Sequence, residues 1–115
     1  MPMSPNPTSR TELVPGTLIL LVLRVLDSGP LHGYAIAQRI SLVSGEVLRV
    51  EEGSLYPALQ RMLLKGWVAA EWSTTAGNRR ARYYRLTPAG RKQLTAEVAQ
   101  FERVTGAIVR LLQTG

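Results

Sequence analysis

The chain has no cysteine and a single histidine, His32, among its 115 residues. Without cysteine there is no disulfide framework, no thiol nucleophile and no Cys-ligated zinc site. One histidine also removes most pairs of nucleophile and base, and a lone histidine in a turn is more often structural than a metal ligand. The composition therefore predicts a protein that is not an enzyme and has neither a metal site nor a cofactor.

Long apolar runs are absent as well. The longest covers residues 18–23 and ends at Arg24, well short of the roughly 18 to 20 residues that a membrane helix needs. The first residues, with Pro2 and Pro5, lack the basic start and the small-residue cleavage site of a secretory signal. We therefore expect a cytoplasmic protein without a membrane partner.

Positive charge is what the sequence has in excess, with 14 Lys and Arg against 8 Asp and Glu and a net charge of +6. A single window between positions 79 and 92 has no acidic residue, and its six cations carry a charge equal to the net charge of the whole chain, +6. Its cations are Arg79, Arg80, Arg82, Arg85, Arg91 and Lys92. A basic run is often only a solvated face, but a polyanionic partner is the leading alternative.

The apolar pattern predicts an arm followed by three helices. Residues 1–11 carry several prolines and no apolar periodicity, which is typical of a flexible arm. Residues 15–26 and 33–43 show helical spacing. A third helix is predicted within residues 51–66. We expect it to begin near Gly53, so that Pro57 falls in its first turn, where a proline is tolerated.

A β-hairpin is predicted next. Residues 67–72 and 82–86 are short aromatic and β-branched segments joined by a polar connection. Alternation along the second strand places Arg82 and Tyr84 on one face and Tyr83 and Arg85 on the other. Trp67 and Trp72 are expected to be packing residues of the hairpin and the core.

A long last helix follows, with Thr87 as its N-cap and Pro88 at its first position, and it is expected to end near position 112. Its apolar side chains recur in steps of three and four, with Thr105 filling one gap. Because the preceding elements already form a closed unit, this stripe is predicted to meet a second subunit.

Three helices followed by a hairpin describe the winged helix-turn-helix, a mainly α fold with a small β-hairpin. Its third helix enters the major groove of DNA, and the hairpin, called the wing, reaches a neighbouring backbone or groove. Residues 12–86 are thus predicted to be a DNA-binding domain and residues 87–115 a dimerisation helix. The basic run would place the cationic wing against phosphates.

Five segments in this order also resemble the PadR family of bacterial transcriptional regulators, over roughly residues 16–112. They are Gly16-Thr17-Leu18, Leu31-His32-Gly33-Tyr34, Gly53-Ser54-Leu55-Tyr56-Pro57-Ala58-Leu59, Gly66-Trp67-Val68 with Glu71-Trp72, and Tyr83-Tyr84-Arg85-Leu86-Thr87-Pro88-Ala89-Gly90. The resemblance implies a homodimer, usually a repressor of a nearby operon and often one released by a small-molecule inducer. The single C-terminal helix is similar to that of the shorter subfamily.

The chain departs from the family pattern at three places. Glu51 and Glu52 stand where an uncharged pair is common, and their carboxylates would repel phosphate unless they act as caps turned away from DNA. In the wing, Asn78 takes the place of a glycine, while Ala81 removes one expected arginine. Phe101 stands where related multidrug-binding regulators often have a tryptophan that helps to form a pocket between subunits.

Three sets of site residues follow from this interpretation. The predicted DNA-binding residues are Tyr34, Gln38, Ser54, Tyr56, Gln60, Arg61, Lys65, Arg79, Arg80 and Arg82. The predicted dimer-interface residues are Leu18, Leu21, Leu94, Val98, Phe101, Thr105, Ile108 and Leu112. A pocket for a small aromatic or phenolic inducer is expected at Phe101, Val98 and Leu18; Phe101 packed against its symmetry mate would leave no such pocket.

A different class of function stays open at this point. The same fold serves in protein-interaction and RNA-binding modules without operator specificity. Such modules would bind duplex DNA weakly and with little salt dependence, or would prefer single strands. The aromatic residues favour duplex DNA, because they fall at expected packing positions and form no stacking platform.

Overall fold

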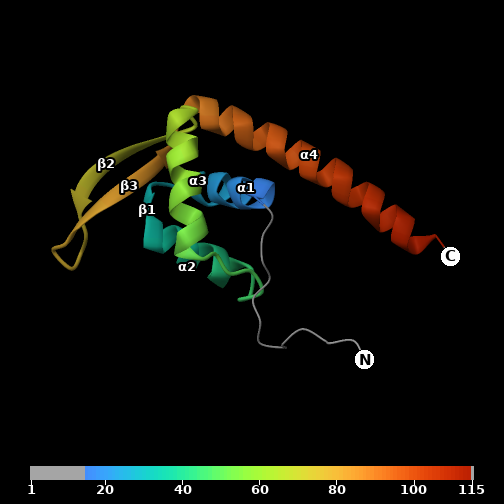
Figure 1. The fold of residues 1–115 in the computed structure, drawn as a ribbon, viewed down its shortest axis with the longest axis horizontal. Helices are drawn as coiled ribbons and strands as arrows, with labels where there is room; N and C mark the ends of the chain where they lie inside the picture. Colours follow the sequence, from blue (N-terminus) through green and yellow to red (C-terminus); the bar gives the residue numbers. More distant parts are fainter. Residues whose placement is uncertain (1–14, 115) are drawn as a thin grey trace.

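The computed structural model describes residues 15–114, and the predicted arm, residues 1–11, lies outside them. The elements follow one another as α1 (Pro15–Leu26), β1 (Leu31–His32), α2 (Gly33–Val43), α3 (Glu52–Leu64), β2 (Val68–Thr74), β3 (Arg80–Leu86) and α4 (Pro88–Gln113). Figure 1 shows the hairpin of β2 and β3 extending to one side of the helices and α4 extending to the other. The predicted winged helix-turn-helix with a long last helix is confirmed.

The core lies among the first three helices and the near end of the sheet. Leu23 of α1, Ile36 of α2 and Leu59 of α3 are completely buried, and Leu86 of β3 closes the core on the sheet side. The helix-turn-helix is therefore held mainly by hydrophobic burial, the largest favourable term in folding.

The sheet has three antiparallel strands in the order β1-β3-β2, one more than the predicted hairpin. Leu31 pairs with Tyr84 and His32 with Tyr83. A two-residue strand shows no alternation of its own, so the sequence pattern gave no sign of it. His32 also caps α2, since its Nδ1 accepts a hydrogen bond from the Ala35 N–H at 3.2 Å. Its predicted structural role is confirmed.

Pro57 lies deeper in α3 than predicted. The helix begins at Glu52, which places Pro57 in the second turn rather than the first. A proline there lacks the N–H that would bond to the Gly53 carbonyl. Gly53 is exposed, so water can reach that carbonyl, which lowers the cost of the missing bond.

The start of α4 is fixed to the turn between α3 and β2. The predicted cap is confirmed: the Thr87 Oγ1 accepts from the Gly90 N–H at 3.0 Å, and its hydroxyl donates to the Gly66 carbonyl at 2.6 Å. A Cβ atom at Gly90 would lie 2.0 Å from the Trp67 carbonyl oxygen, so no larger residue fits there. This close approach sets the direction in which α4 leaves the wing.

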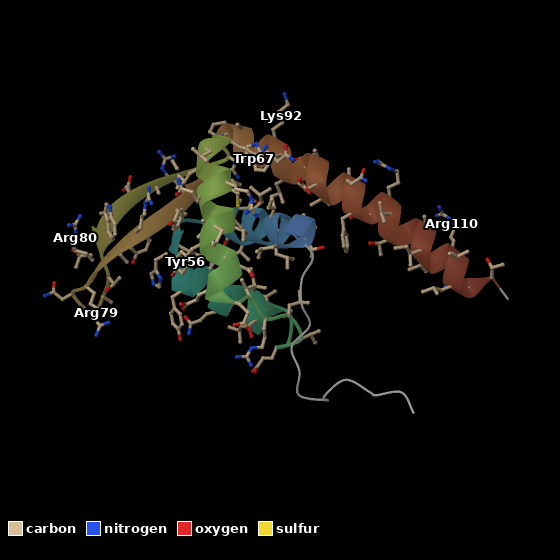
Figure 2. All side chains as sticks on the ribbon, in the orientation of Figure 1. Tyr56, Trp67, Arg79, Arg80, Lys92 and Arg110 are labelled. Atoms are coloured by element: carbon tan, nitrogen blue, oxygen red, sulfur yellow. The ribbon has the colours of Figure 1, made fainter. Side chains whose placement is uncertain are left out.

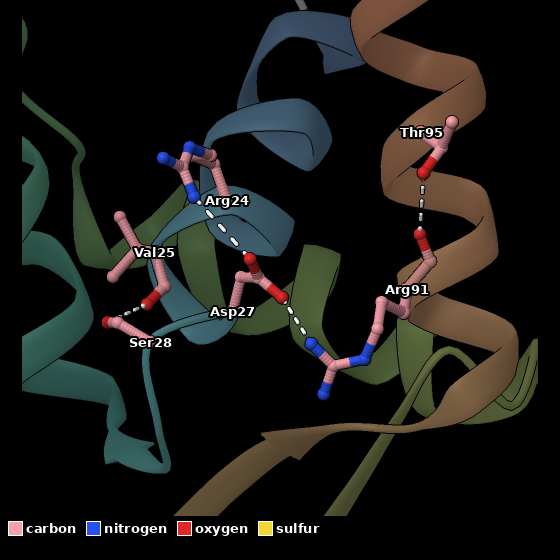
Figure 3. A network of polar contacts seen from close by, with 6 residues as sticks. All are labelled: Arg24, Val25, Asp27, Ser28, Arg91 and Thr95. Atoms are coloured by element: carbon pink, nitrogen blue, oxygen red, sulfur yellow. Dashed lines mark hydrogen bonds and ion pairs between the residues drawn. The ribbon is translucent and has the colours of Figure 1, made fainter.

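An ion-pair network joins the end of α1 to α4. Asp27 pairs with Arg24 at 3.5 Å and with Arg91 of α4, as Figure 3 shows. The Arg91 carbonyl in turn accepts a hydrogen bond from the Thr95 hydroxyl at 3.3 Å. The arginines are largely exposed, so each pair contributes about 0 to 1 kcal/mol and serves mainly to orient α4. Within residues 15–114, no helix is both long and apolar enough to cross a membrane.

Candidate nucleic-acid interface

The crossing of α2 and α3 depends on a contact between a glycine and a tyrosine. A Cβ atom at Gly33, the first residue of α2, would lie 2.7 Å from Cε1 and 2.8 Å from the hydroxyl oxygen of Tyr56. The Tyr56 ring therefore lies directly on the first turn of α2. Absence of a side chain at Gly33 lets the two helices of the helix-turn-helix approach this closely.

Tyr56 keeps one side in solvent, with 44% of the residue exposed. Its pKa is raised above 10.0, first by burial and then by the nearby Glu52 carboxylate and Tyr84. The hydroxyl therefore stays protonated at neutral pH and is a hydrogen-bond donor. A donor at the start of α3 suits an unesterified phosphate oxygen, the contact predicted for Tyr56.

The other predicted residues of α3 are all exposed, but they are spread over its whole length. Ser54 lies near the start, Gln60 and Arg61 lie in the middle, and Lys65 is the C-cap. The Lys65 Nζ lies 5.3 Å from the centre of the Trp67 ring, at the end of the helix where the recognition surface is expected to finish. Sequence reasoning missed Leu64, which is 78% exposed on the same helix.

On α2, Tyr34 and Gln38 are exposed as predicted DNA-contacting residues must be, and Arg39 next to them is a further exposed cation. Gln38 and Arg39 line an open groove of about 440 Å³. The groove is completed by Leu31, Ala35, Ser41, Leu42 and Glu46. It is formed by β1, α2 and the turn after α2, and it does not include Phe101, where an inducer pocket is predicted.

The wing tip is a tight turn built around Asn78. Its N–H donates to the Thr75 carbonyl at 2.9 Å, and the Thr75 N–H donates to the Arg79 carbonyl at 2.7 Å. Asn78 has φ of 63°, a left-handed conformation that asparagine adopts more readily than most residues. Asparagine therefore replaces the expected glycine without disturbing the turn.

The faces of β3 are as predicted, with Arg82 and Tyr84 on one of them, but Trp72 is not a packing residue. It pairs with Arg82 across the strands, beyond the edge of the core, and is 59% exposed. Its ring has the Arg80 guanidinium at 5.1 Å from its centre. The Arg82 guanidinium lies 5.8 Å from the centre of the buried Tyr84 ring. The prediction that Trp72 packs in the core is therefore wrong.

The basic run divides into two separate groups. Arg79, Arg80, Arg82 and Arg85 are exposed on the wing, with Arg85 on the opposite face of β3 from Arg80 and Arg82, whereas Arg91 is paired with Asp27. Figure 2 shows Lys92 on α4, pointing away from the part of the wing that carries Arg79 and Arg80. The cationic surface of the wing is thus smaller than the sequence window suggested, because Arg91 and Lys92 lie on α4 and Arg91 is paired with Asp27.

Comparison with known proteins identifies the family to which the chain belongs. A sequence model described as the transcriptional regulator PadR-like family matches residues 22–96. The chain belongs to this family. A PadR family transcriptional regulator from Eggerthella lenta has a solved structure that is 31% identical, with a TM-score of 0.72, covering 87% of this chain and 85% of that one. The PadR resemblance is thereby confirmed, and this PadR-like chain is a DNA-binding transcription regulator and not an enzyme.

Two relatives compared by sequence are similar to this PadR-like chain over different shares of their own length. A transcriptional regulator of Mycobacterium tuberculosis is 32% identical over 90 residues, which are 78% of this chain and 80% of that protein. An uncharacterized 37.1 kDa protein of a Streptomyces fradiae transposon is 43% identical over 89 residues, 77% of this chain. The match spans only 24% of that relative's length.

The residues predicted for dimerisation of this PadR-like chain fall into two groups. Leu18 and Leu94 are buried in the chain's own core, at 5% and 7% exposed, and Leu21, Val98 and Thr105 are partly buried. Beyond Val98 the same side of α4 is exposed. Its large apolar residues are Phe101, Val104, Ile108, Val109, Leu111 and Leu112. Of the predicted pocket, Leu18 thus lies beneath the surface, while Phe101 and Val98 have exposed area.

Glu51 and Glu52 are both exposed at the start of α3 of this PadR-like chain. Glu51 is the N-cap residue, but its side chain makes no capping hydrogen bond. Glu52 lies in the first turn, where a carboxylate interacts favourably with the helix dipole. It is also near enough to raise the pKa of Tyr56, so any phosphate bound by Tyr56 would have this carboxylate nearby.

Proposed function

We propose that this PadR-like regulator is a homodimeric repressor that binds a pseudo-palindromic operator close to the genes it controls. The observation that carries the proposal is the separation of two surfaces on one chain. Exposed Tyr56, Gln60 and Arg61 on α3 and the wing arginines form the first surface, and the apolar residues of α4 beyond Val98 form the second. Figure 2 shows Arg79 and Arg80 at one end of the molecule and Arg110, on α4, at the other.

Dimerisation through α4 is supported by the burial pattern along that helix. Leu94 and Val98 pack on the chain's own core, and the same stripe continues through Phe101, Ile108 and Leu112, which nothing covers within residues 15–114. A contiguous apolar surface of this kind marks an interaction site. A two-fold pair would cover it and would present two α3 helices to one face of a duplex.

The α3 and wing surface is proposed to bind duplex DNA through both kinds of contact. Arginine and glutamine can read guanine and adenine edges in the major groove, which suits Arg61 and Gln60. Arg79, Arg80 and Arg82 would neutralise phosphates, a contact that gives affinity and salt dependence but no sequence information.

Release by a small aromatic or phenolic molecule is proposed for the subunit interface near Phe101 and Val98. A ligand there would lower DNA affinity only if it binds more tightly to a dimer whose α3 helices are too far apart or too close together for the operator, and only by that difference in ligand affinity. Aromatic compounds that bind should raise the melting temperature and release DNA. If no compound does either, and Phe101→Ala merely weakens the dimer, the ring is interface core and the inducer proposal fails.

Stoichiometry on DNA tests the proposal as a whole. Sedimentation of the full chain with a duplex should give complexes with two chains per duplex, and competing single-stranded RNA should not displace the DNA. One chain per duplex would contradict the dimer. Stronger binding to RNA would favour an RNA-binding module instead.

A further inference from the structure

Trp72 stands at the centre of a row of side chains on the wing. It pairs across the strands with Arg82, and Thr74 pairs with Arg80. The Arg80 guanidinium lies 5.1 Å from the centre of the indole ring, within the range of a cation–π interaction. The exposed indole is therefore next to Arg80 and Arg82, the two arginines on this face of β3.

The row lies on the face of the sheet that α3 covers. Residues that alternate along a strand share a face, so Arg80 and Arg82 point the same way as the buried Tyr84. The Arg82 guanidinium lies 5.8 Å from the centre of the Tyr84 ring, and Tyr84 is close enough to Tyr56 to affect its pKa. Aromatic and arginine side chains thus continue from the start of α3 to the wing tip.

Core packing does not explain an exposed indole at this position. The core ends at Tyr84 and Leu86, and β2 is an edge strand. The ring instead contacts the Arg80 guanidinium, at the end of a long side chain with many rotamers. A long arginine side chain loses rotamer freedom when it binds a phosphate, and less is lost if it is already held.

We propose that Trp72 is a positioning residue of the wing that holds Arg80, so that the Arg80 guanidinium is set toward the DNA backbone beside that of Arg82, which lies over Tyr84. The inference rests on the proposed DNA-binding surface. It assigns to the indole no contact with DNA of its own; the contact belongs to the arginines.

The first test compares Trp72→Leu with Trp72→Phe on a labelled duplex of mixed sequence, about 30 base pairs long, because phosphate contacts do not depend on sequence. Trp72→Leu should weaken binding by about three- to tenfold, whereas Trp72→Phe keeps an aromatic face and should weaken it less than about twofold. The log–log salt slope should not change, because no cation is removed. Equal losses in both variants would overturn the proposal.

A double-mutant cycle with Arg80→Ala separates positioning from direct contact. If the indole acts through Arg80, Trp72→Leu should have little further effect once Arg80 is alanine. Additive losses would mean that Trp72 touches DNA itself or that the wing has unfolded, and either result overturns the positioning role. A parent chain that fails to bind the duplex overturns the proposed function and this inference together, whereas a parent that binds equally well with Trp72→Leu overturns only this inference.

A measurement without DNA covers the case in which Trp72→Leu fails to fold. In a Trp67→Phe background Trp72 is the sole tryptophan, so its fluorescence reports on that ring alone. Arg80→Ala should make the indole more accessible to a neutral quencher, while Arg85→Ala, on the opposite face of β3, should not. Equal quenching in the two variants would contradict the proposal that the indole holds the Arg80 side chain.

Discussion

Gly33 and Tyr56 are in such close contact that a single added carbon at Gly33 would lie 2.7 Å from the tyrosine ring. The contact joins the first turn of α2 to the start of α3. Because Tyr56 is also a predicted phosphate-binding residue, packing of the helix-turn-helix and geometry of the DNA surface depend on the same side chain.

Gly33→Ala should therefore lower the free energy of unfolding by about 1 to 3 kcal/mol, the usual cost of overpacking, measured by urea denaturation. Gly53→Ala in α3 is the matched control. A Cβ atom there meets nothing within 4 Å, so this variant should be stabilised by up to about 1 kcal/mol. In a Tyr56→Ala background the cost of Gly33→Ala should largely disappear, and an unchanged cost would rule out the contact as its cause.

Alkaline pH should destabilise the chain partly through Tyr56. The pKa of this phenol is raised above 10.0 in the folded chain, so the unfolded chain loses the proton first as the pH rises. Its contribution to stability is therefore complete below pH 10 and is lost as the pH rises through the raised pKa. Tyr56→Phe should lose less stability than the parent in this range. Identical alkaline losses would show that Tyr56 titrates as an ordinary tyrosine.

Salt dependence should distinguish the two groups of the basic run. Arg79→Ala with Arg80→Ala should weaken binding to every duplex and make the log–log salt slope shallower by about two for each bound subunit. Arg91→Ala with Lys92→Ala removes the same charge from α4 and should leave the slope nearly unchanged. If both double variants change the slope equally, net charge rather than the wing governs binding.

A charge in the apolar row of α4 should separate the subunits. Ile108→Glu places a carboxylate among exposed apolar side chains and should give a folded monomer by sedimentation, with weaker DNA binding. Ala99→Glu, an exposed position on the opposite side of the same helix, should remain a dimer. Truncation after Gly90 is a poorer test, because it also removes Leu94 from the chain's own core. A dimer that survives Ile108→Glu would place the interface elsewhere.

Local signals in the sequence predicted most of the fold. The bounds of α1 and α2 were predicted as observed, because apolar spacing and the breaks after Leu26 and before Gly33 are local. The Thr87 cap was predicted for the same reason. The strand β1 was missed, because its pairing with β3 joins residues about 50 positions apart and has no local pattern.

The candidate site was predicted less completely, because exposure depends on the assembled molecule. Tryptophan is a residue type that usually packs in a core. Trp72 is exposed only because it lies beyond the core along β2. Arg91 is a cation within the basic run and so resembles a DNA-binding residue in the sequence, but in the folded chain it pairs with Asp27. Leu18 and Leu94 belong to the predicted apolar stripes, yet the chain covers them itself. Whether a second subunit also touches them stays a prediction.

Selection of duplexes from a randomised DNA pool tests the central claim most directly, namely that two copies of this chain read DNA with α3 and the wing. The selected sites should be pseudo-palindromes with half-sites about one helical turn, or a small multiple of it, apart. Gln60→Ala should relax the preference at particular bases, while Arg79→Ala should weaken all sites alike. A pool that yields no enriched duplex, or a single site without two-fold symmetry, would contradict the account.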